Sequence, residues 1–492
     1  MSSQFLLSDP IRRDRRPLPS GPKGLPLLGV ALEHPKQEFW KAYARWGKEY
    51  DNNSGLISFH ILGRRIIVIN SRQMAETLLD NRGAIYSDRQ TLPNDVRSYN
   101  DRLRDYRRLM HQDFNSREST KYWQLQEHEA IVLLKSLLDT PENIFEHIRR
   151  FSGAVILKIA YGYEVKSEHD RLMALTKEGM RVASLAAAPG RWLVDSFPIL
   201  RYIPRWFPGA GFKRKAERWG ELLYSQSLIP HNFVKKEIAA GKASSSFSSK
   251  YLCPENGESV SAELEDLVLW TSGALFTGGS DTTVSVVQTF VLVMALNPDI
   301  QRLAQAEIDR VIGHDRLPKM TDCEDLPYVG AIIKETLRWG TVSPLGLPRS
   351  TAREDEVMGY KIPKGCVVFA NIWAMLHDES VYPDPEKFNP SRFMGEKQLQ
   401  QPDPRELAFG RGRRACPGQF IAEASVFIQV ASLLATFDIR KGFDDDDIQS
   451  TKPHIIGFTT AIVSFMKPFK CKLVPRRKEI RTLIEDALAE II

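Results

Sequence analysis

A single cysteine, Cys416, stands among glycines and arginines in the segment FGRGRRACPG at residues 409–418. A cysteine sulfur binds a metal only when it is deprotonated, and nearby positive charge or the amides that open a helix favour that state. The charge comes from Arg411, Arg413 and Arg414. The apolar run from Phe420 to Leu434 predicts a helix that begins at the cysteine. We therefore expect a thiolate ligand at a helix N-terminus, although a buried structural cysteine in an arginine-rich turn would have the same surroundings.

Five residues of this segment have the spacing FxxGxRxCxG: Phe409, Gly412, Arg414, Cys416 and Gly418. The pattern resembles the haem-binding loop of the cytochrome P-450 superfamily, the haem-thiolate monooxygenases. The resemblance implies that the cofactor is haem b, that Cys416 is the axial ligand of its iron, and that the other four residues form the binding loop. Gly412 and Gly418 would permit backbone conformations and a close approach that a side chain would block.

The longest apolar helical pattern, from Ser261 to Leu296, is interrupted midway by the sequence GGSDTT at residues 278–283. Burying an unpaired carboxylate or hydroxyl costs on the order of several kcal/mol, and adjacent glycines weaken a helix, so we expect a local opening there. The segment resembles the oxygen-binding groove of the same family. That resemblance implies that Thr282 hydrogen-bonds dioxygen and that Asp281 relays protons from solvent. A polar kink in a core helix or a membrane span would also fit, but Glu263 and its acidic neighbours oppose the span.

An ExxR pair, Glu335 and Arg338, lies on a helix predicted from Leu326 to Trp339. The i, i+3 spacing places both side chains on one face, where an exposed pair contributes only about 0.2–0.5 kcal/mol. In this order along the chain the pair resembles the core salt bridge of the family, which Arg392 of the sequence FNPSRF would complete. The resemblance implies a structural triad that supports the thiolate loop.

Two further arginines are assigned to the cofactor by the resemblance. Arg107 lies in a basic helix predicted from Asp101 to His111, and Arg349 ends an extended segment broken by prolines. Each would reach a haem propionate. Family members usually carry WxxxR in the basic helix, and here Leu103 stands in place of the tryptophan, so one propionate donor is lost or replaced. Apolar residues before Arg349, together with Phe458 to Ile462, are expected to contact the substrate.

Most of the 492-residue chain has helical periodicity. A hairpin is predicted from Leu56–Ile61 and Arg65–Ile69, and Ser244 to Lys250 is expected to be a short serine-rich linker. The resemblance implies a mainly α fold with small β-sheets, the triangular helical domain of cytochrome P-450. We expect the catalytic domain at residues 30–476 and a helical C-terminal tail at residues 477–492.

Residues 1–29 are expected to be a basic tail and a proline-rich hinge without a membrane anchor. The apolar patch Phe5 to Leu7 is far shorter than the roughly 20 residues that span a bilayer. The hinge resembles the one that follows the anchor in microsomal members, which implies the cytosolic face of the endoplasmic reticulum; a soluble or peripheral protein is also compatible. The aromatic and proline-rich stretch from Trp192 to Pro208 suits a membrane interface or the cover of a substrate channel.

Composition excludes several classes of protein. The net charge of +6 comes from basic residues spread along the chain without aromatic interleaving, which argues against a nucleic-acid partner and suits an acidic protein or an anionic membrane surface. Five scattered cysteines with no CxxCH sequence argue for reduced thiols and against covalently attached haem.

The resemblance implies insertion of one oxygen atom from O2 into a small hydrophobic substrate, by hydroxylation or epoxidation. Electrons would come from NADPH–cytochrome P-450 reductase, docked near Arg107, Arg108 and Arg413. The sequence looks most like fungal members that oxidise terpenoid or aromatic secondary metabolites. Two alternatives are a haem-thiolate isomerase or dehydratase, and a non-catalytic haem-binding paralogue. The intact pair Asp281 and Thr282 favours oxygen activation over both.

Overall fold

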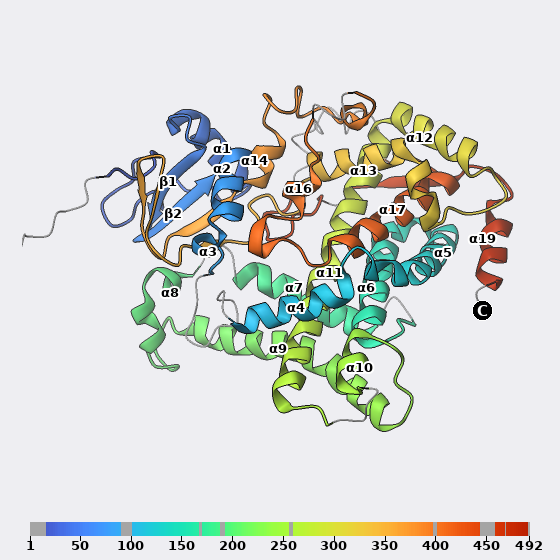
Figure 1. The fold of residues 1–492 in the computed structure, drawn as a ribbon, viewed down its shortest axis with the longest axis horizontal. Helices are drawn as coiled ribbons and strands as arrows, with labels where there is room; N and C mark the ends of the chain where they lie inside the picture. Colours follow the sequence, from blue (N-terminus) through green and yellow to red (C-terminus); the bar gives the residue numbers. More distant parts are fainter. Residues whose placement is uncertain are drawn as a thin grey trace, which may run out of the picture.

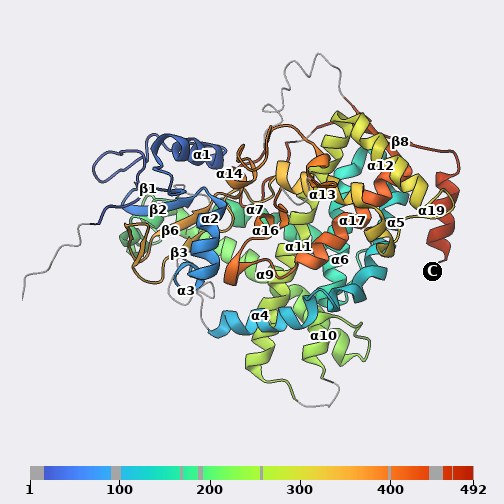
Figure 2. The ribbon, with the colours of Figure 1, turned by 45° about the horizontal axis from the view of Figure 1, so that its top comes forward.

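The protein is mainly helical, with its largest sheet at one end and strand β8 (Cys471–Pro475) near the other (Figures 1 and 2). This computed structural model describes residues 16–89, 101–166, 170–186, 192–254, 259–396, 401–442, 458–467 and 469–490. The predicted mainly α fold with small β-sheets is confirmed. Most of the basic tail, residues 1–15, lies outside the described residues.

The largest sheet has four strands in the order β1-β2-β6-β3. Their bounds are β1 (Leu56–Ile61), β2 (Arg64–Ile69), β6 (Val367–Ala370) and β3 (Arg349–Ser350). The predicted hairpin is confirmed: β1 and β2 are antiparallel with Ser58 opposite Ile67, and they turn at Gly63, whose φ is 80°. β6 runs parallel to β2 and antiparallel to β3. This pairing places Arg349 in the same sheet as a hairpin formed nearly 300 residues earlier in the chain, with β6 between them.

Two smaller sheets pair β4 (Asp355–Val357) with β5 (Tyr360–Ile362) and β7 (Phe437–Lys441) with β8 (Cys471–Pro475). The helices that build the core and the site are α1 (Phe39–Tyr50), α4 (Asp101–Phe114), α5 (Trp123–Asp139), α6 (Ile144–Tyr161), α7 (Arg171–Ala186), α9 (Gly211–Ala239), α11 (Ala262–Leu296), α12 (Pro298–Val311), α13 (Pro327–Trp339) and α17 (Gln419–Thr436). Shorter helices are α2 (Arg72–Ala75), the π-helix η1 (Glu76–Asn81), α3 (Gly83–Tyr86), α8 (Leu193–Ser196), α10 (Phe247–Leu252), α14 (Ile372–Leu376), α16 (Arg405–Ala408) and α19 (Ile480–Ala489).

Helix α11 runs through the middle of the helical part and contacts α6, α9 and α17 (Figures 1 and 2). It is continuous from Ala262 to Leu296, so the predicted opening of the helix is wrong. A Cβ atom built on Gly279 would lie 2.9 Å from Cγ1 of Ile156, which shows that the glycine lets α6 pack closely. This packing offsets the weak helix propensity of glycine, a cost of about 1 kcal/mol.

Two helices, α11 and α17, are long and apolar enough to cross a membrane by length and composition. Their most apolar windows are 83% and 72% buried inside the protein, as expected for core helices. The segment expected to be a serine-rich linker instead starts α10. The Ser246 Oγ accepts from the Ser249 backbone N–H, and the Ser249 Oγ accepts from the Ser246 N–H, a capping box that precedes the buried Phe247.

The C-terminal helix α19 packs against α5 (Figure 1). Ile480 and Ile484 are buried in this contact, and the Arg481 Nη1 donates to Asp139 Oδ1 at 3.2 Å. Buried apolar residues from α5, α6, α11, α12, α13 and α17 form one continuous core, while a smaller core lies beneath the four-stranded sheet. The thiolate loop and its neighbours lie between these two cores.

Candidate active site

The segment around Cys416 is a tight loop between α16 and α17. The Cys416 N–H donates to the Phe409 carbonyl oxygen at 2.7 Å, which closes the loop. Gly410 and Gly412 have φ values of 73° and 65°, a region that favours glycine. A Cβ built on Gly412 would lie only 1.9 Å from the Leu79 carbonyl oxygen of η1, so a side chain there would push the loop away from the sheet region.

The start of α17 differs from the sequence prediction by three residues. The helix begins at Gln419, with Gly418 as its N-cap, so Cys416 precedes the helix and does not open it. Gly418 has φ −95° and open space around a built Cβ, so no contact within the described chain requires glycine there. The packing of the chain itself therefore requires glycine at position 412 but not at position 418.

The thiol of Cys416 keeps some accessible surface, but protein encloses it on most sides. This burial raises the pKa of the thiol. A hydrogen bond from the Gly418 backbone N–H and the charge of Arg107 act in the opposite direction and favour the thiolate. A metal cation bound by the sulfur would favour the thiolate further, because a coordinated thiol is deprotonated outright.

The three arginines of the loop do not turn toward the thiol, so the prediction that they supply its positive charge is wrong. Arg411 Nε donates to Asp80 Oδ2 at 2.6 Å, Arg414 Nε donates to the Ser87 carbonyl oxygen at 2.9 Å, and Arg413 is exposed. The cation that acts on the thiol comes from another helix: Arg107 of α4, whose Nη2 donates to the Ala415 carbonyl oxygen at 2.8 Å.

Four guanidinium groups converge beside the thiolate loop: Arg89, Arg107, Arg349 and Arg414. The Arg349 Nη2 donates to the Arg411 carbonyl oxygen at 2.8 Å, while its Nη1 is buried without a hydrogen-bond partner among the described residues. Burial and the neighbouring charges of Arg89 and Arg107 lower the pKa of Arg349 to about 10. Burial and the same two cations, with Arg349, lower the pKa of Arg414 to about 10.

Such a cluster is unfavourable without a counter-charge, because like charges repel strongly at low dielectric. Among the described residues, Asp80 acts on Arg349 and Asp88 on Arg414, each as a lesser influence than the repulsion. The orphaned Nη1 of Arg349 and the convergence of guanidinium groups therefore fit a ligand with more than one carboxylate, held beside Cys416. Haem, with its two propionates, has this chemistry.

Arg89 is the member of the cluster that the sequence analysis missed. Two backbone contacts hold the residues just before it: the Ser350 N–H donates to the Asp88 carbonyl oxygen at 2.7 Å, and Arg414 donates to Ser87. These contacts place Arg89 beside Arg349 and Arg414. The sequence signal was weak, because Arg89 stands at the edge of an irregular loop.

The acid and the alcohol of α11 are adjacent in sequence but turn toward different neighbours. Arg149 Nη1 of α6 donates to Asp281 Oδ1 at 3.0 Å, and the Asp281 carboxyl is buried. This burial raises the pKa of Asp281, while the charges of Arg149 and Lys177 oppose the rise. The Thr282 hydroxyl is half-buried and donates to the Gly278 carbonyl oxygen at 2.8 Å. Arg149 and Lys177 carried no sequence signal that singled them out.

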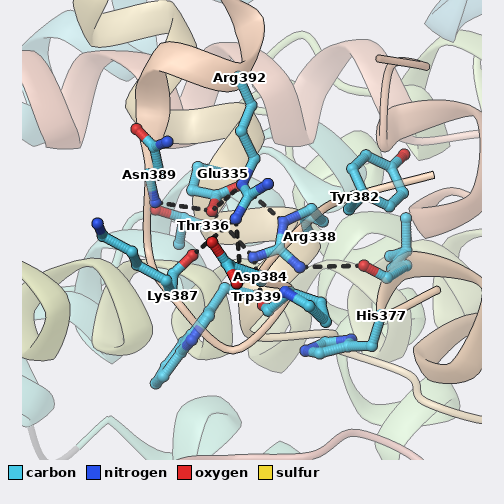
Figure 3. A network of polar contacts seen from close by, with 12 residues as sticks. Glu335, Thr336, Arg338, Trp339, His377, Tyr382, Asp384, Lys387, Asn389 and Arg392 are labelled. Atoms are coloured by element: carbon cyan, nitrogen blue, oxygen red, sulfur yellow. Dashed lines mark hydrogen bonds and ion pairs between the residues drawn. The ribbon is translucent and has the colours of Figure 1, made fainter. Parts of the chain in front are cut away.

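Glu335, Arg338 and Arg392 come together in a buried network (Figure 3). Arg338 Nε donates to Glu335 Oε2 at 2.7 Å and its Nη2 donates to Oε1 at 2.9 Å. Arg392 Nε donates to the same Oε1 at 3.3 Å. Both guanidinium groups also donate to backbone carbonyls of the segment 376–387, and the network thereby ties α13 to the chain that leads toward the thiolate loop.

Comparison with known proteins accounts for this geometry. A family model described as cytochrome P-450 matches residues 19–466. The chain belongs to the cytochrome P-450 family. Among its relatives is cytochrome P-450 monooxygenase 208 of Postia placenta, 39% identical over 96% of this chain and 92% of the relative. Cytochrome P-450 monooxygenase claR of Ampulloclitocybe clavipes is 37% identical over 98% of this chain and 90% of the relative.

A further relative is cytochrome P-450 monooxygenase ppsD of Aspergillus oryzae, 35% identical over 95% of this chain and 90% of the relative. The expected enzyme class, an oxidoreductase that incorporates oxygen, is confirmed for this cytochrome P-450. So is the resemblance to fungal members of the family.

This cytochrome P-450 has a cavity of about 450 Å³ between the four-stranded sheet and the segment at residues 460–462. Both segments that the sequence analysis expected to contact substrate line it, the first through Pro344, Leu345 and Gly346 and the second through Thr460, Ala461 and Ile462. Its described lining includes neither Cys416 nor Thr282.

Proposed function

We propose that this cytochrome P-450 inserts one oxygen atom from O2 into a small hydrophobic organic substrate, by hydroxylation or epoxidation. The observation that carries the proposal is the thiol of Cys416 beside a convergent group of arginines in which the buried Nη1 of Arg349 has no hydrogen-bond partner among the described residues. The apolar lining of the adjacent cavity supports a hydrophobic substrate. Terpenoid or aromatic secondary metabolites fit both this lining and the fungal relatives.

Haem b fits the residues present. Cys416 would hold the iron, Phe409, Gly412, Gly418 and Arg414 would form the binding loop, and Arg89, Arg107 and Arg349 would join Arg414 in neutralising the propionates. When bound, haem supplies the binding and reductive activation of dioxygen. Glu335, Arg338 and Arg392 are proposed to support the loop without touching the reactants.

The residues of α11 are proposed to deliver the protons that this chemistry consumes. Burial favours the protonated form of Asp281, so the carboxyl can hold a proton at neutral pH more readily than an exposed aspartate. To pass this proton on, the Asp281 carboxyl must give up the hydrogen bond that Arg149 donates to its Oδ1 and form one to water or to the Thr282 hydroxyl. The Thr282 hydroxyl, bonded to Gly278, can rotate to donate into the site without breaking the helix.

The first test is the absorption spectrum of the dithionite-reduced protein with and without carbon monoxide. A strongly red-shifted Soret band that Cys416→Ala abolishes, and that Cys366→Ala at a buried site elsewhere leaves intact, supports the proposal. Absence of haem, or a spectrum of histidine ligation in fresh wild-type protein, contradicts it.

The second test separates oxygen activation from isomerisation. Thr282→Ala is expected to keep consuming NADPH while product falls and hydrogen peroxide rises, because protons no longer reach the site in an ordered way. Thr283→Ala, the adjacent buried threonine, serves as the control. Equal product and peroxide yields in Thr282→Ala and wild type would remove Thr282 from the mechanism. Turnover that needs neither NADPH nor O2 would indicate a haem-thiolate isomerase or dehydratase.

Electrons are proposed to come from NADPH–cytochrome P-450 reductase, docked on the face that carries Arg108 and Arg413. Both are exposed, although Arg108 also pairs with Asp105. Arg107, the third residue expected at this face, is half-buried and donates to Ala415, so it is assigned to the cofactor instead. Charge reversal at Arg108 or Arg413 is expected to slow reduction by the reductase at low salt and to leave reduction by dithionite unchanged.

Peripheral contact with the cytosolic face of the endoplasmic reticulum is also proposed, and an exposed apolar group supports it. The aromatic and proline-rich stretch contributes Leu193, Phe197, Ile199, Tyr202, Trp206 and Phe207. Trp206 is 79% exposed and Ile199 is 74% exposed. Flotation with anionic liposomes tests this: a protein with Ile199→Ser and Trp206→Ser should bind less than wild type, whereas Leu303→Ser, which removes an exposed leucine of α12, should not.

The division of the chain is proposed as a tail and hinge over residues 1–29, a catalytic domain over residues 30–476 and a helical tail over residues 477–492. Because α19 packs on α5, the helical tail at residues 477–492 is attached to the catalytic domain. Limited proteolysis that removes the tail without loss of bound haem would support this division.

A further inference from the structure

Two segments that line the cavity are joined to elements of the proposed active site. Pro348 lines the cavity, and the next residue, Arg349, donates to the thiolate loop. On the other side the hairpin whose tip is Thr460 to Ile462 is bonded to α11: the Ser285 Oγ donates to the Ser464 carbonyl oxygen at 2.6 Å. Ser285 lies one turn beyond Thr282, so this segment is tied to the helix that carries the proposed acid and alcohol.

The outer end of the cavity is formed by the turn that precedes α1, with His34, Pro35 and Lys36. His34 is satisfied by the protein, since its Nε2 bonds the Tyr43 hydroxyl at 2.7 Å, and burial lowers its pKa to about 4, so the ring is neutral at pH 7. Lys36 is exposed and makes no ion pair within the described part of the chain.

The charges of the lining are one-sided. Apart from His34, Lys36, Ser184 and Thr460, the described residues that line the cavity are apolar. None of the described lining residues is Asp or Glu, and because His34 is neutral, Lys36 is the only charged one among them. Two hydroxyls, those of Ser184 and Thr460, add hydrogen-bonding capacity, and the remaining side chains are apolar.

We infer that the substrate is an apolar molecule that carries a carboxylate, and that Lys36 binds this carboxylate while the apolar body extends along Leu345, Phe369 and Ile462 toward the reacting centre. The inference rests on the proposed function, because it names the substrate class of the same enzyme. A volume of about 450 Å³ accepts a molecule of ordinary small-ligand size. An amine of the same skeleton would meet the positive charge of Lys36 with no carboxylate in the lining to offset it.

Calorimetric titration of the holoprotein with dodecanoic acid and with dodecan-1-ol tests the inference, because the two probes share a chain and differ in charge. Lys36→Gln is expected to weaken binding of the acid about fivefold, the upper range for an ion pair near the surface, and to leave binding of the alcohol unchanged. Lys48→Gln, at an exposed lysine of α1 outside the cavity, should change neither. The preference of wild type for the acid should shrink in 1 M salt.

A second variant locates the binding. Ala461→Trp places a large side chain in the cavity and should weaken both probes by a similar factor. If Lys36→Gln affects acid and alcohol alike, or neither, the role of Lys36 is overturned. If Ala461→Trp leaves both affinities intact, the cavity is not the binding site, and the inference fails as well.

The same preparations are examined by the carbon monoxide difference spectrum. A normal thiolate spectrum with no charge-dependent binding rejects this inference and leaves the proposed function standing. Loss of the thiolate spectrum rejects the proposed function, while the calorimetric comparison still decides whether Lys36 binds a carboxylate.

Discussion

Replacing Glu335 by glutamine removes the only negative charge between two buried guanidinium groups while it keeps the volume of the side chain. Glu335 and Arg338 have no exposed surface, and Arg392 is 4% exposed. Glu335 Oε1 accepts from Arg338 Nη2, Arg392 Nε and the Asn389 N–H, and Oε2 accepts from Arg338 Nε. A glutamine that places its oxygen at the Oε1 position must place its NH2 group at the Oε2 position, where it faces the Nε–H of Arg338.

The expected cost follows from this geometry. Breaking a buried ion pair by neutralising one partner costs about 3–5 kcal/mol. Both arginines keep their carbonyl acceptors, among them Leu376, Pro385 and Asp384, so we expect the lower half of that range. Unfolding entropy scales with length and amounts to about 1 kcal/mol per kelvin for a chain of 492 residues. The melting temperature should therefore fall by about 3–4 °C.

Thermal unfolding of the holoprotein, followed by circular dichroism at 222 nm at a fixed scan rate, measures this shift. Glu324→Gln, at an exposed glutamate, is the matched control and should melt within about 0.5 °C of wild type, the usual range for surface substitutions at this scale. If Glu335→Gln melts as wild type does, the carboxylate charge does not stabilise the folded state, and the triad would have to be regarded as a set of arginine–carbonyl contacts in which Glu335 is replaceable.

Three further changes test other parts of the site. Gly412→Ala and Gly410→Ala both place an alanine at positive φ, but the new Cβ would lie 1.9 Å from the Leu79 carbonyl oxygen in the first and 3.8 Å from the nearest atom in the second. Gly412→Ala should therefore reduce the free energy of unfolding by about 1–3 kcal/mol more than Gly410→Ala and retain less haem per chain. Equal losses in the two variants would show that the contact with Leu79 is unimportant. Burial lowers the pKa of His377 to about 3, so the folded protein binds fewer protons than the unfolded chain below pH 6.5, and its stability falls as pH falls; from pH 6.5 to 5 this amounts to about 2 kcal/mol, or about 2 °C. In His377→Phe the acid-induced decrease in melting temperature should be smaller by that amount, whereas His111→Phe at an exposed position should behave as wild type; identical slopes for all three proteins would refute the assignment. Arg89→Leu should transfer haem to apomyoglobin about tenfold faster than wild type, as expected for a lost charge-assisted hydrogen bond of about 1.5 kcal/mol. The additional change Leu103→Trp should slow the transfer again. An unchanged rate in Arg89→Leu, or the same acceleration in Arg353→Leu at an exposed site, would show that Arg89 is not part of the cofactor site.

The thiolate loop illustrates how far local patterns reach. The spacing of Gly412 and Cys416 predicted a tight loop, and the glycine proves to occupy a left-handed conformation, a property that glycine carries wherever it stands. Likewise the i, i+3 spacing of Glu335 and Arg338 predicted two side chains on one helical face, which α13 confirms. Helical periodicity and hairpin signals are local too, and the mainly α fold with a hairpin at Gly63 was predicted for that reason.

Predictions failed where a local tendency was opposed by packing. Two glycines suggested an open helix at residues 278–279, but the close approach of Ile156 from α6 makes use of the missing side chain and the helix stays intact. A run of serines suggested a linker, but Phe247 buries itself against Phe114 and the serines cap the helix that carries it. In each case contacts with a distant part of the chain outweighed a propensity of about 1 kcal/mol.

The sequence by itself determined which residues could do the chemistry: one thiol in a loop built on glycines, an acid and an alcohol side by side on a long apolar helix, and an acid–base pair at helical spacing. Only the tertiary structure decided where the charged side chains point. It turned Arg411 to Asp80 and Arg107 toward Ala415, joined Arg149 to Asp281, gathered Arg89 with Arg349, and placed Lys36 at the cavity. The reason is that a long charged side chain adopts the conformation in which it finds a partner, and these partners lie up to about 330 residues away in sequence.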